Sequence, residues 1–220
     1  MATYFCPPTY ALIVTNNLFF ITKNNCALYG TRKQKNMGRI EFFIQGLKHI
    51  NDIGTVTRSS KNLSKNIASH VNYDDAKIII EIGAGDGVIT KQILSKMRPD
   101  AKLISFEINS VFCNNLRAIG DDRLIVIEDS AEKILEILPK YGYEKADYIV
   151  SAVPFVAFPK ERTLKIVNAC RDGLEEGGKY IQLHYSLKLK DLYESVFGNV
   201  TKHFVFLNVP PAFVLVSEKR

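Results

Sequence analysis

The chain has 220 residues, 46% hydrophobic and 24% charged, which is typical of a globular protein with one sizeable core. No apolar run approaches the roughly 18 residues of a membrane-spanning helix, and the four cysteines form no Cys-x-x-Cys pair, which argues against a zinc site or a disulfide framework. Residues 1–70 hold nine lysines and arginines against two acids, a net charge of +7, whereas the whole chain carries +6. This basic segment favours an anionic partner, either nucleic acid or a membrane surface, although a solvated, solubilising face would have the same composition.

Residues 1–36 show no clear pattern. Tyr10–Thr22 is apolar but is interrupted by Asn16 and Asn17, and it lacks the flanking features of a signal peptide. Met37 directly precedes the first clear helical pattern. We therefore expect residues 1–36 to be a dispensable, poorly ordered extension, with translation able to start at Met37.

Residues 37–72 are expected to form two basic helices. Arg39–Ile50 has apolar residues at helical spacing, and this helix can pack on the sheet as a lid or lie in a membrane interface. Ser59 or Ser60 can cap the second helix. The apolar face of that second helix comprises Leu63, Ile67, Ala68 and Val71.

Residues 73–220 are predicted to form one α/β domain. Five buried strands alternate with helices, and two further strands with no room for a helix between them complete the pattern. We expect a Rossmann-like, doubly wound, seven-stranded sheet with a C-terminal antiparallel β-hairpin. The expected strands are Ile78–Ile82, Leu103–Ile108, Leu124–Glu128, Tyr148–Val153, Lys179–Tyr185, Lys202–Val209 and Ala212–Ser217. The expected helices begin after Gly87, near Asn109 or Ser110, at Ser130 (ending at Pro139), at Lys160 (ending at Asp172) and at Leu187 (ending at Phe197).

The first of these strands runs into a glycine-rich turn, and a helical pattern starts directly after it. Glycines let the backbone itself approach a ligand, and a strand, glycine turn and helix form the nucleotide-binding corner of a Rossmann-like unit. The dinucleotide fingerprint would need glycine at position 88, where Val88 stands. The spacing is instead Glu-x-Gly-x-Gly-x-Gly, beginning at Glu81. The glycines are Gly83, Gly85 and Gly87.

This spacing resembles the first motif of class I S-adenosylmethionine-dependent methyltransferases. That cofactor has no phosphate and carries cationic sulfonium and amino groups, which suit acids near the turn such as Glu81 and Asp86. The resemblance implies that Glu107 accepts hydrogen bonds from both ribose hydroxyls. It also implies that Asp129 takes the adenine amino group, with the backbone of Ser130 or its neighbour at the ring nitrogen. The implied cofactor site comprises Glu81, Gly83, Ala84, Gly85, Glu107, Asp129, Ser130 and Ser151.

Each of these acids alone would also fit a helix N-cap or a solvated loop. Glu81, Glu107 and Asp129 stand, however, at the ends of successive predicted strands. The carboxyl ends of parallel strands meet at one edge of a sheet, so the three carboxylates are expected together there.

The segment Ser151–Phe155 follows the fourth strand, where the family places its acceptor-binding motif. In N6-adenine and rRNA adenine dimethylating enzymes the motif reads Asn-x-Pro-Tyr, whereas Ser and Phe occupy the Asn and Tyr positions here. We also expect the helical C-terminal RNA domain of the rRNA enzymes to be missing, because the sequence given stops at Arg220.

The sequence is more similar to the bacterial phospholipid N-methyltransferases, small enzymes that convert phosphatidylethanolamine stepwise to phosphatidylcholine. The similarity spans about residues 38–218, and Arg58 replaces a proline that the family usually has. The matching elements are Gly54 with Ser59-Ser60, Ser151-x-x-Pro154, Gln182-Leu183-His184-Tyr185, and Asn208-x-Pro210-Pro211-Ala212.

An acceptor amine must attack in its neutral form, yet a free amine of this kind has a pKa of about 10. We expect Tyr185 to orient or deprotonate it and Ser151 to hold it, with His184 nearby. Aromatic faces suit the quaternary ammonium product. The expected substrate-binding residues are Ser59, Ser60, Pro154, Phe155 and Phe158. Alternatively, Phe155 and Phe158 are loop-anchoring core residues, and His184 is a structural strand histidine.

Three functions remain open at this point. The first is a phospholipid N-methyltransferase, a monomer bound peripherally to the cytoplasmic face of an anionic membrane through Arg39–Ile50. The second is a nucleic-acid adenine N6-methyltransferase that uses the basic segment to hold RNA, although the adjacent Phe42 and Phe43 fit membrane insertion better than base stacking. The third is a protein that binds S-adenosylmethionine without catalysis. No metal is expected in the site.

Overall fold

The computed structural model describes residues 10–15, 18–23, 61–206, 208 and 211–220. The chain divides into two compact units, Met1–Met37 and Gly38–Arg220. The predicted helix Arg39–Ile50 and the candidate residues Ser59 and Ser60 lie outside the described residues.

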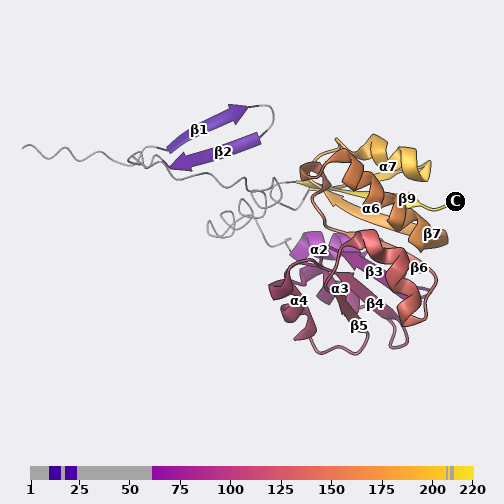
Figure 1. The fold of residues 1–220 in the computed structure, drawn as a ribbon. Coiled ribbons are helices and arrows are strands. Elements are labelled where there is room, and N and C mark those ends of the chain that lie inside the picture. Colours follow the sequence, from indigo (N-terminus) through magenta and orange to yellow (C-terminus); the bar gives the residue numbers. More distant parts are fainter. Residues whose placement is uncertain (1–9, 16–17, 24–60, 207, 209–210) are drawn as a thin grey trace, which may run out of the picture. The chain divides into compact units, whose positions relative to one another are not determined.

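The first unit contains an antiparallel hairpin, which the sequence pattern did not lead us to expect (Figure 1). Strand β1 (Tyr10–Thr15) pairs with β2 (Leu18–Lys23), and Thr15 lies opposite Leu18. Both segments are rich in β-branched and aromatic residues, and a two-residue link is the commonest hairpin connection.

The second unit is built on a seven-stranded sheet with the order β5-β4-β3-β6-β7-β9-β8 (Figure 1). The pairs among β3 to β7 are parallel, and β9 is antiparallel to both of its neighbours. This confirms the predicted doubly wound sheet and its C-terminal hairpin. The strands are β3 (Ile78–Ile82), β4 (Lys102–Phe106), β5 (Leu124–Ile127), β6 (Ala146–Ser151), β7 (Leu174–His184), β8 (Thr201–Val205) and β9 (Ala212–Glu218).

Helices connect these strands, and two of them differ from the prediction. The helix expected from Ser130 to Pro139 is instead a four-residue α-helix between two 3₁₀ turns, and the helix expected from Leu187 begins at Lys190. None of the described helices is long and apolar enough to cross a bilayer. The α-helices are α2 (Lys61–Ala68), α3 (Val88–Leu94), α4 (Ser110–Arg117), α5 (Ile134–Ile137), α6 (Lys160–Gly173) and α7 (Lys190–Phe197). The 3₁₀ turns are η1 (Ala131–Lys133), η2 (Leu138–Tyr141) and η3 (Phe155–Ala157).

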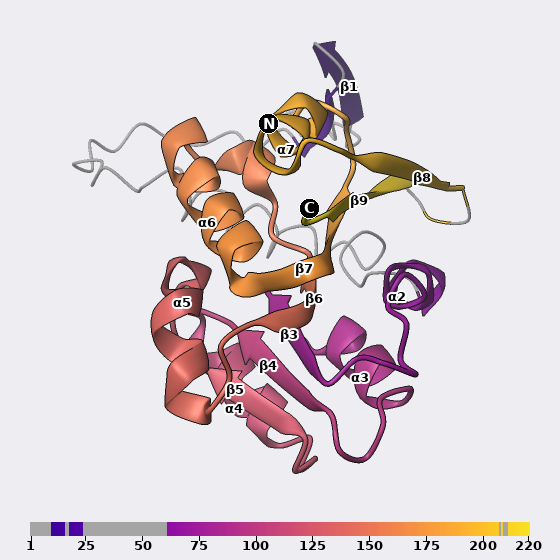
Figure 2. The ribbon, with the colours of Figure 1, turned by 90° about the vertical axis from the view of Figure 1, so that its right-hand side faces the viewer.

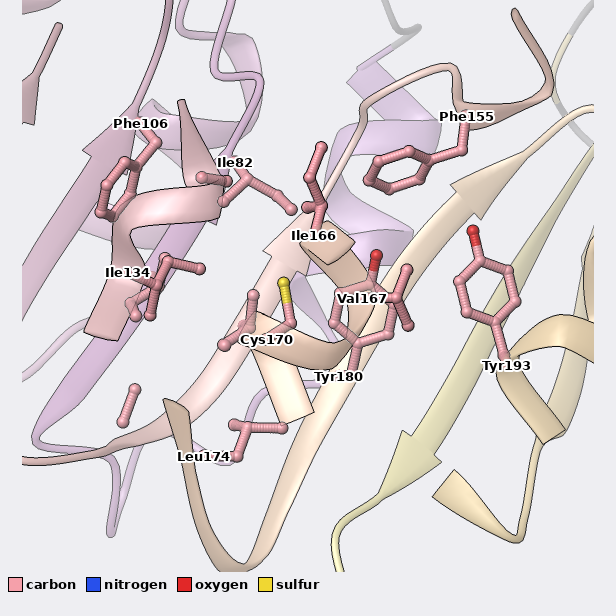
Figure 3. Packing of buried hydrophobic residues seen from close by; sticks show 14 of the residues in the cluster. Ile82, Phe106, Ile134, Phe155, Ile166, Val167, Cys170, Leu174, Tyr180 and Tyr193 are labelled. Atoms are coloured by element: carbon pink, nitrogen blue, oxygen red, sulfur yellow. The ribbon is translucent and has the colours of Figure 1, made fainter. Parts of the chain in front are cut away.

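Helices cover both faces of the sheet, as a parallel sheet requires (Figure 2). On one face, Ile80 and Ile82 pack in a core with residues of α5, α6 and α7, and Figure 3 shows part of it. On the other face, Ile79 packs with α2 and α3. Each large apolar side chain fully buried in this way contributes about 1.5–3 kcal/mol.

Alternation along β3 also decides where its acid lies. Glu81 lies on the same face as Ile79, toward α3, because successive side chains of a strand point to opposite faces. The sheet therefore places a carboxylate beneath the glycine turn and presents the carboxyl ends of β3 to β7 at one edge.

Candidate functional site

The glycine turn after β3 adopts the left-handed backbone conformation that its sequence predicts, with φ values of 73° at Gly83, 55° at Gly85 and 77° at Gly87. A Cβ atom on Gly83 would lie 2.7 Å from Cγ2 of Val153, so the turn packs directly against the loop after β6. A Cβ on Gly85 would meet no atom within 4 Å. The backbone at Gly85 therefore borders open space that a ligand can enter.

Glu81 is a buried acid, and only one of its two side-chain oxygens accepts hydrogen bonds from the described residues. It is 2% exposed, and its Oε2 accepts hydrogen bonds from the hydroxyls of Thr90 (2.7 Å) and Ser105 (2.8 Å). Its Oε1 has no hydrogen-bond partner within the part of the chain that the structure describes. Burial raises the pKa of this carboxyl to about 7. Such a group fits a ligand that brings a cation or a hydrogen-bond donor.

Glu107, directly after β4, lies over the glycine turn. Its Oε2 accepts a hydrogen bond from the Gly85 amide (2.9 Å), and its Oε1 accepts one from the Asn109 amide (2.9 Å). A carboxylate has about four acceptor positions, so capacity remains for ligand hydroxyls. The structure thus brings together Glu81, the turn and Glu107, the expected centre of the cofactor site.

Two apolar side chains on this same edge were missed in the sequence. Ile108 and Val111, which flank the start of α4, are 58% and 64% exposed. The sequence offered no signal for them, because the exposure of a side chain follows from the fold.

Asp129 follows β5 on the same edge of the sheet. Its Oδ1 accepts a hydrogen bond from the Ser130 amide (2.7 Å), and its Oδ2 forms an ion pair with Lys133 at 2.7 Å. The hydrogen bond from Lys133 holds the pKa of this carboxyl below its usual value. Ser130 caps η1 by accepting a hydrogen bond from the Glu132 amide. The expected role of Asp129 toward adenine stays a prediction.

The loop after β6 is held by a buried polar network. Ser151 is fully buried at the end of β6, and its Oγ accepts a hydrogen bond from the Val153 amide (3.3 Å). Gln182 of β7, also fully buried, donates from Nε2 to the Val153 carbonyl (3.0 Å) and accepts at Oε1 from the Tyr180 hydroxyl (2.5 Å). Gln182 belongs to an element that matched the family, but neither its hold on the loop nor the role of Tyr180 was predicted, because both depend on contacts with β6 and its loop.

The aromatic residues of this loop lie in different environments. Phe155 is 1% exposed and packs in the core below the loop (Figure 3). It makes an edge contact with half-buried Phe158 at 5.7 Å between ring centroids, and the guanidinium of Arg162 lies over the Phe158 ring. Pro154, between Ser151 and Phe155, is half-buried. This geometry favours the loop-anchoring alternative for Phe155.

His184 and Tyr185, at the end of β7, differ in accessibility. His184 is 3% exposed, its Nε2 is hydrogen-bonded to the Tyr193 hydroxyl of α7 (2.7 Å), and burial lowers its pKa to about 4. Tyr185 is 52% exposed. Partial burial raises the pKa of the Tyr185 phenol. The side chain of Tyr185 is also hydrogen-bonded to Asn208. Of the two, only Tyr185 is accessible to a substrate at this edge.

Replacing Gly83 with alanine tests the contact between turn and loop. We expect a loss of about 3 kcal/mol in the free energy of unfolding, since left-handed backbone costs about 1–2 kcal/mol and the clash with Val153 adds to it. Gly142→Ala is the matched control, because Gly142 has a φ of 80° but no atom lies within 4 Å of the position that its added Cβ would take. Urea unfolding measures both, and equal losses would contradict the proposed contact.

Comparison with known proteins gives consistent matches. A family model described as "Ribosomal RNA adenine dimethylase" matches residues 57–168. The chain is 31% identical over 168 residues to the ornithine lipid N-methyltransferase of Singulisphaera acidiphila, and the match covers 75% of this chain and 88% of that protein.

Two solved structures illustrate the likeness of fold. The precorrin-6y C5,15-methyltransferase of Geobacter metallireducens has a TM-score of 0.58 at 15% identity, over 77% of this chain and 96% of that one. A 16S rRNA methyltransferase of T. thermophilus, in complex with AdoMet and guanosine, has a TM-score of 0.56 at 20% identity, over 74% of this chain and 44% of that one. At such identities these structures confirm the predicted fold alone.

Proposed function

Because this chain belongs to the ribosomal RNA adenine dimethylase family of class I S-adenosylmethionine-dependent methyltransferases, we propose that it methylates the amine of a membrane lipid. The acceptor proposed is phosphatidylethanolamine and its methylated intermediates, leading toward phosphatidylcholine. The enzyme would act as a peripheral protein at the cytoplasmic membrane face. The relative named as an ornithine lipid N-methyltransferase supports a lipid acceptor and makes ornithine lipid the second candidate.

The residues at the edge of β3 to β5 fit the cofactor. The open Oε1 of Glu81 suits its cationic amino group, Glu107 suits its ribose hydroxyls, and the backbone at Gly85 can approach it closely. When bound, S-adenosylmethionine supplies the methyl group from its sulfonium carbon. We propose Ala84, Asp129, Ser130 and Ser151 as the remaining members of this site.

A cavity beside the acceptor loop is the observation that carries the lipid proposal. It has a volume of about 540 Å³ and lies between η3, the start of α6 and α7. Its apolar lining is Phe155, Val156, Phe158, Leu164, Leu189 and Leu192. Lys160, Lys188 and Asp191 also line it, and neither of these lysines forms an ion pair with the described residues. An apolar wall with free cations suits an acyl chain attached to an anionic group, whereas RNA recognition relies on exposed aromatic faces and base edges.

The acceptor end of the site offers positioning groups rather than a strong base. The raised pKa of Tyr185 keeps its phenol neutral at physiological pH, so we propose that it orients the lipid amine by hydrogen bonding. Because Ser151 is fully buried, we propose that it acts on the amine indirectly, by holding the loop through Val153. Orientation of a neutral amine toward the methyl carbon can supply much of the catalysis for an in-line displacement.

The function is tested by incubating the full chain with S-adenosylmethionine and vesicles that contain phosphatidylethanolamine, with ornithine lipid vesicles in parallel. Chromatography of the extracted lipids is expected to show the successive methylated products of phosphatidylethanolamine. Products from ornithine lipid alone would select the second candidate. Product from neither lipid would refute a lipid acceptor of these classes.

The two cavity lysines give a sharper prediction. We expect Lys160→Ala combined with Lys188→Ala to lower kcat/KM for vesicular phosphatidylethanolamine roughly tenfold, because an anionic phosphate loses two partners worth together about 1.4 kcal/mol at a partly exposed site. The affinity for S-adenosylmethionine should not change. Lys165→Ala removes an exposed lysine of α6 outside the cavity lining and is the control. Equal activities of the double variant and the control would count against the cavity as the lipid site.

A further inference from the structure

We propose that the aromatic surface of the C-terminal hairpin inserts into the interface of an anionic bilayer. This hairpin surface consists of Phe204, Phe206 and Phe213. Phe204 is 55% exposed and Phe206 75%, while Phe213 is half-buried. The rings are adjacent, since the Phe204 centroid lies 5.2 Å from that of Phe213 and 6.4 Å from that of Phe206. Contiguous exposed aromatic residues of this kind mark an interaction surface.

Strand register places the hairpin surface at the acceptor edge of the sheet. Phe213 of β9 lies opposite His184 of β7 on one side and opposite Phe204 of β8 on the other. Because β9 is antiparallel to both neighbours, β8 and β7 run in the same direction, and Phe206 extends beyond the carboxyl end of β8. The hydrogen bond between Tyr185 and Asn208 links this end of the hairpin to β7. A surface resting here on a bilayer would bring lipid amines to the loop after β6.

The aromatic rings and the positive charge near the hairpin surface favour an anionic bilayer as its partner. Residues 195–217 include Lys202 and His203 but no aspartate or glutamate. Lys202 is exposed on the edge strand β8 (Figure 2), two residues before Phe204 and therefore on the same face of that strand. Aromatic side chains favour the membrane–water interface, and each lysine near an anionic surface adds about 1 kcal/mol. The hairpin surface comprises different residues from Arg39–Ile50, the contact predicted from the sequence, and the inference rests on the proposed lipid function.

The absence of tryptophan from the sequence allows a direct test. Phe206→Trp gives the chain a single tryptophan, whose emission should shift to shorter wavelength when vesicles of phosphatidylethanolamine and phosphatidylglycerol are added. Tyr141→Trp is the control, because Tyr141 is 44% exposed in η2, before the amino end of β6. No shift at Phe206→Trp, or equal shifts in both variants, would overturn the inference. A shift without lipid that grows with protein concentration would indicate self-association and would overturn it too.

A second variant separates this inference from the proposed function. Phe204→Ser with Phe206→Ser should reduce vesicle partitioning at least about tenfold while binding of S-adenosylmethionine and methylation of detergent-dispersed lipid are retained. Undiminished partitioning of this variant would refute the hairpin surface and leave the lipid function standing. If the unaltered chain methylates no lipid in detergent, the function fails, and the tryptophan shift still decides independently whether the hairpin surface meets a bilayer.

Discussion

Glu107→Ala is expected to weaken the binding of S-adenosylmethionine about 100-fold and to abolish methyl transfer at ordinary cofactor concentrations. The proposed ribose contacts are hydrogen bonds to a charged group, each worth about 1.5–3 kcal/mol, and 100-fold corresponds to about 2.7 kcal/mol. The variant also leaves the Gly85 and Asn109 amides without their acceptor, so the turn loses a support on the side where the cofactor binds. Isothermal titration calorimetry with the unaltered and variant chains measures the change.

Two further variants make this result specific. Glu107→Gln keeps one oxygen acceptor and should lose less affinity than the alanine variant. Glu128→Ala removes an exposed acid at the end of β5, paired with Arg117 at 3.2 Å, and should bind the cofactor normally. Cofactor binding by Glu107→Ala that matches the unaltered chain would remove Glu107 from the site.

Glu81→Gln is expected to stabilise the ligand-free protein at pH 8 while weakening its cofactor binding. The pKa of Glu81 is about 7 in the folded protein against 4.5 for an ordinary glutamate, because burial disfavours the charged form. Protonated Glu81 therefore stabilises the folded state fully below about pH 4.5. This contribution to the free energy of unfolding is lost as the pH rises through about 7. The shift corresponds to about 3 kcal/mol at most, so we expect a gain of about 2 kcal/mol for the neutral variant at pH 8.

The same substitution removes the negative charge proposed to meet the cationic amino group, so cofactor affinity should fall about tenfold at pH 8. In the unaltered chain, affinity should rise between pH 6 and pH 8 as Glu81 ionises. Urea unfolding and calorimetry at both pH values provide the measurements. Glu136→Gln, which removes an exposed glutamate of α5, should leave both pH profiles unchanged. A Glu81→Gln protein that is destabilised at pH 8, with unaltered cofactor affinity, would refute the account of this group.

Local sequence patterns predicted the strand, the glycine turn and the sheet that hold the site. The isoleucine run and the glycine spacing predicted β3 and its turn. Of the two residues expected near the start of α4, Asn109 is the cap, and its side chain accepts from the Val111 amide at 2.9 Å. The chain order of strands and helices, together with the short link before β9, was enough for the sheet and its reversed strand. These features depend on neighbouring residues, so a sequence read in order can reveal them.

The contacts that shape the site depend on residues far apart in the chain. The two hydroxyls that hold Glu81 come from α3 and β4, and the amide of Gln182 that holds the acceptor loop comes from β7. The partner of His184 comes from α7. No spacing rule connects these residues, because their meeting depends on the register of the sheet and the packing of helices on it. The exposed aromatic residues of the hairpin were likewise assigned to strands without any indication of which face they would occupy.

The most direct test of the central proposal offers two acceptors to one enzyme. S-adenosylmethionine labelled in its methyl group is incubated with the full chain, lipid vesicles containing phosphatidylethanolamine and total RNA in the same reaction, followed by separation of the lipid and aqueous phases. Glu107→Ala serves as the inactive reference. We predict label in the lipid phase, dependent on Glu107, and none in RNA above the reference. Label that enters RNA and not lipid would contradict the proposal.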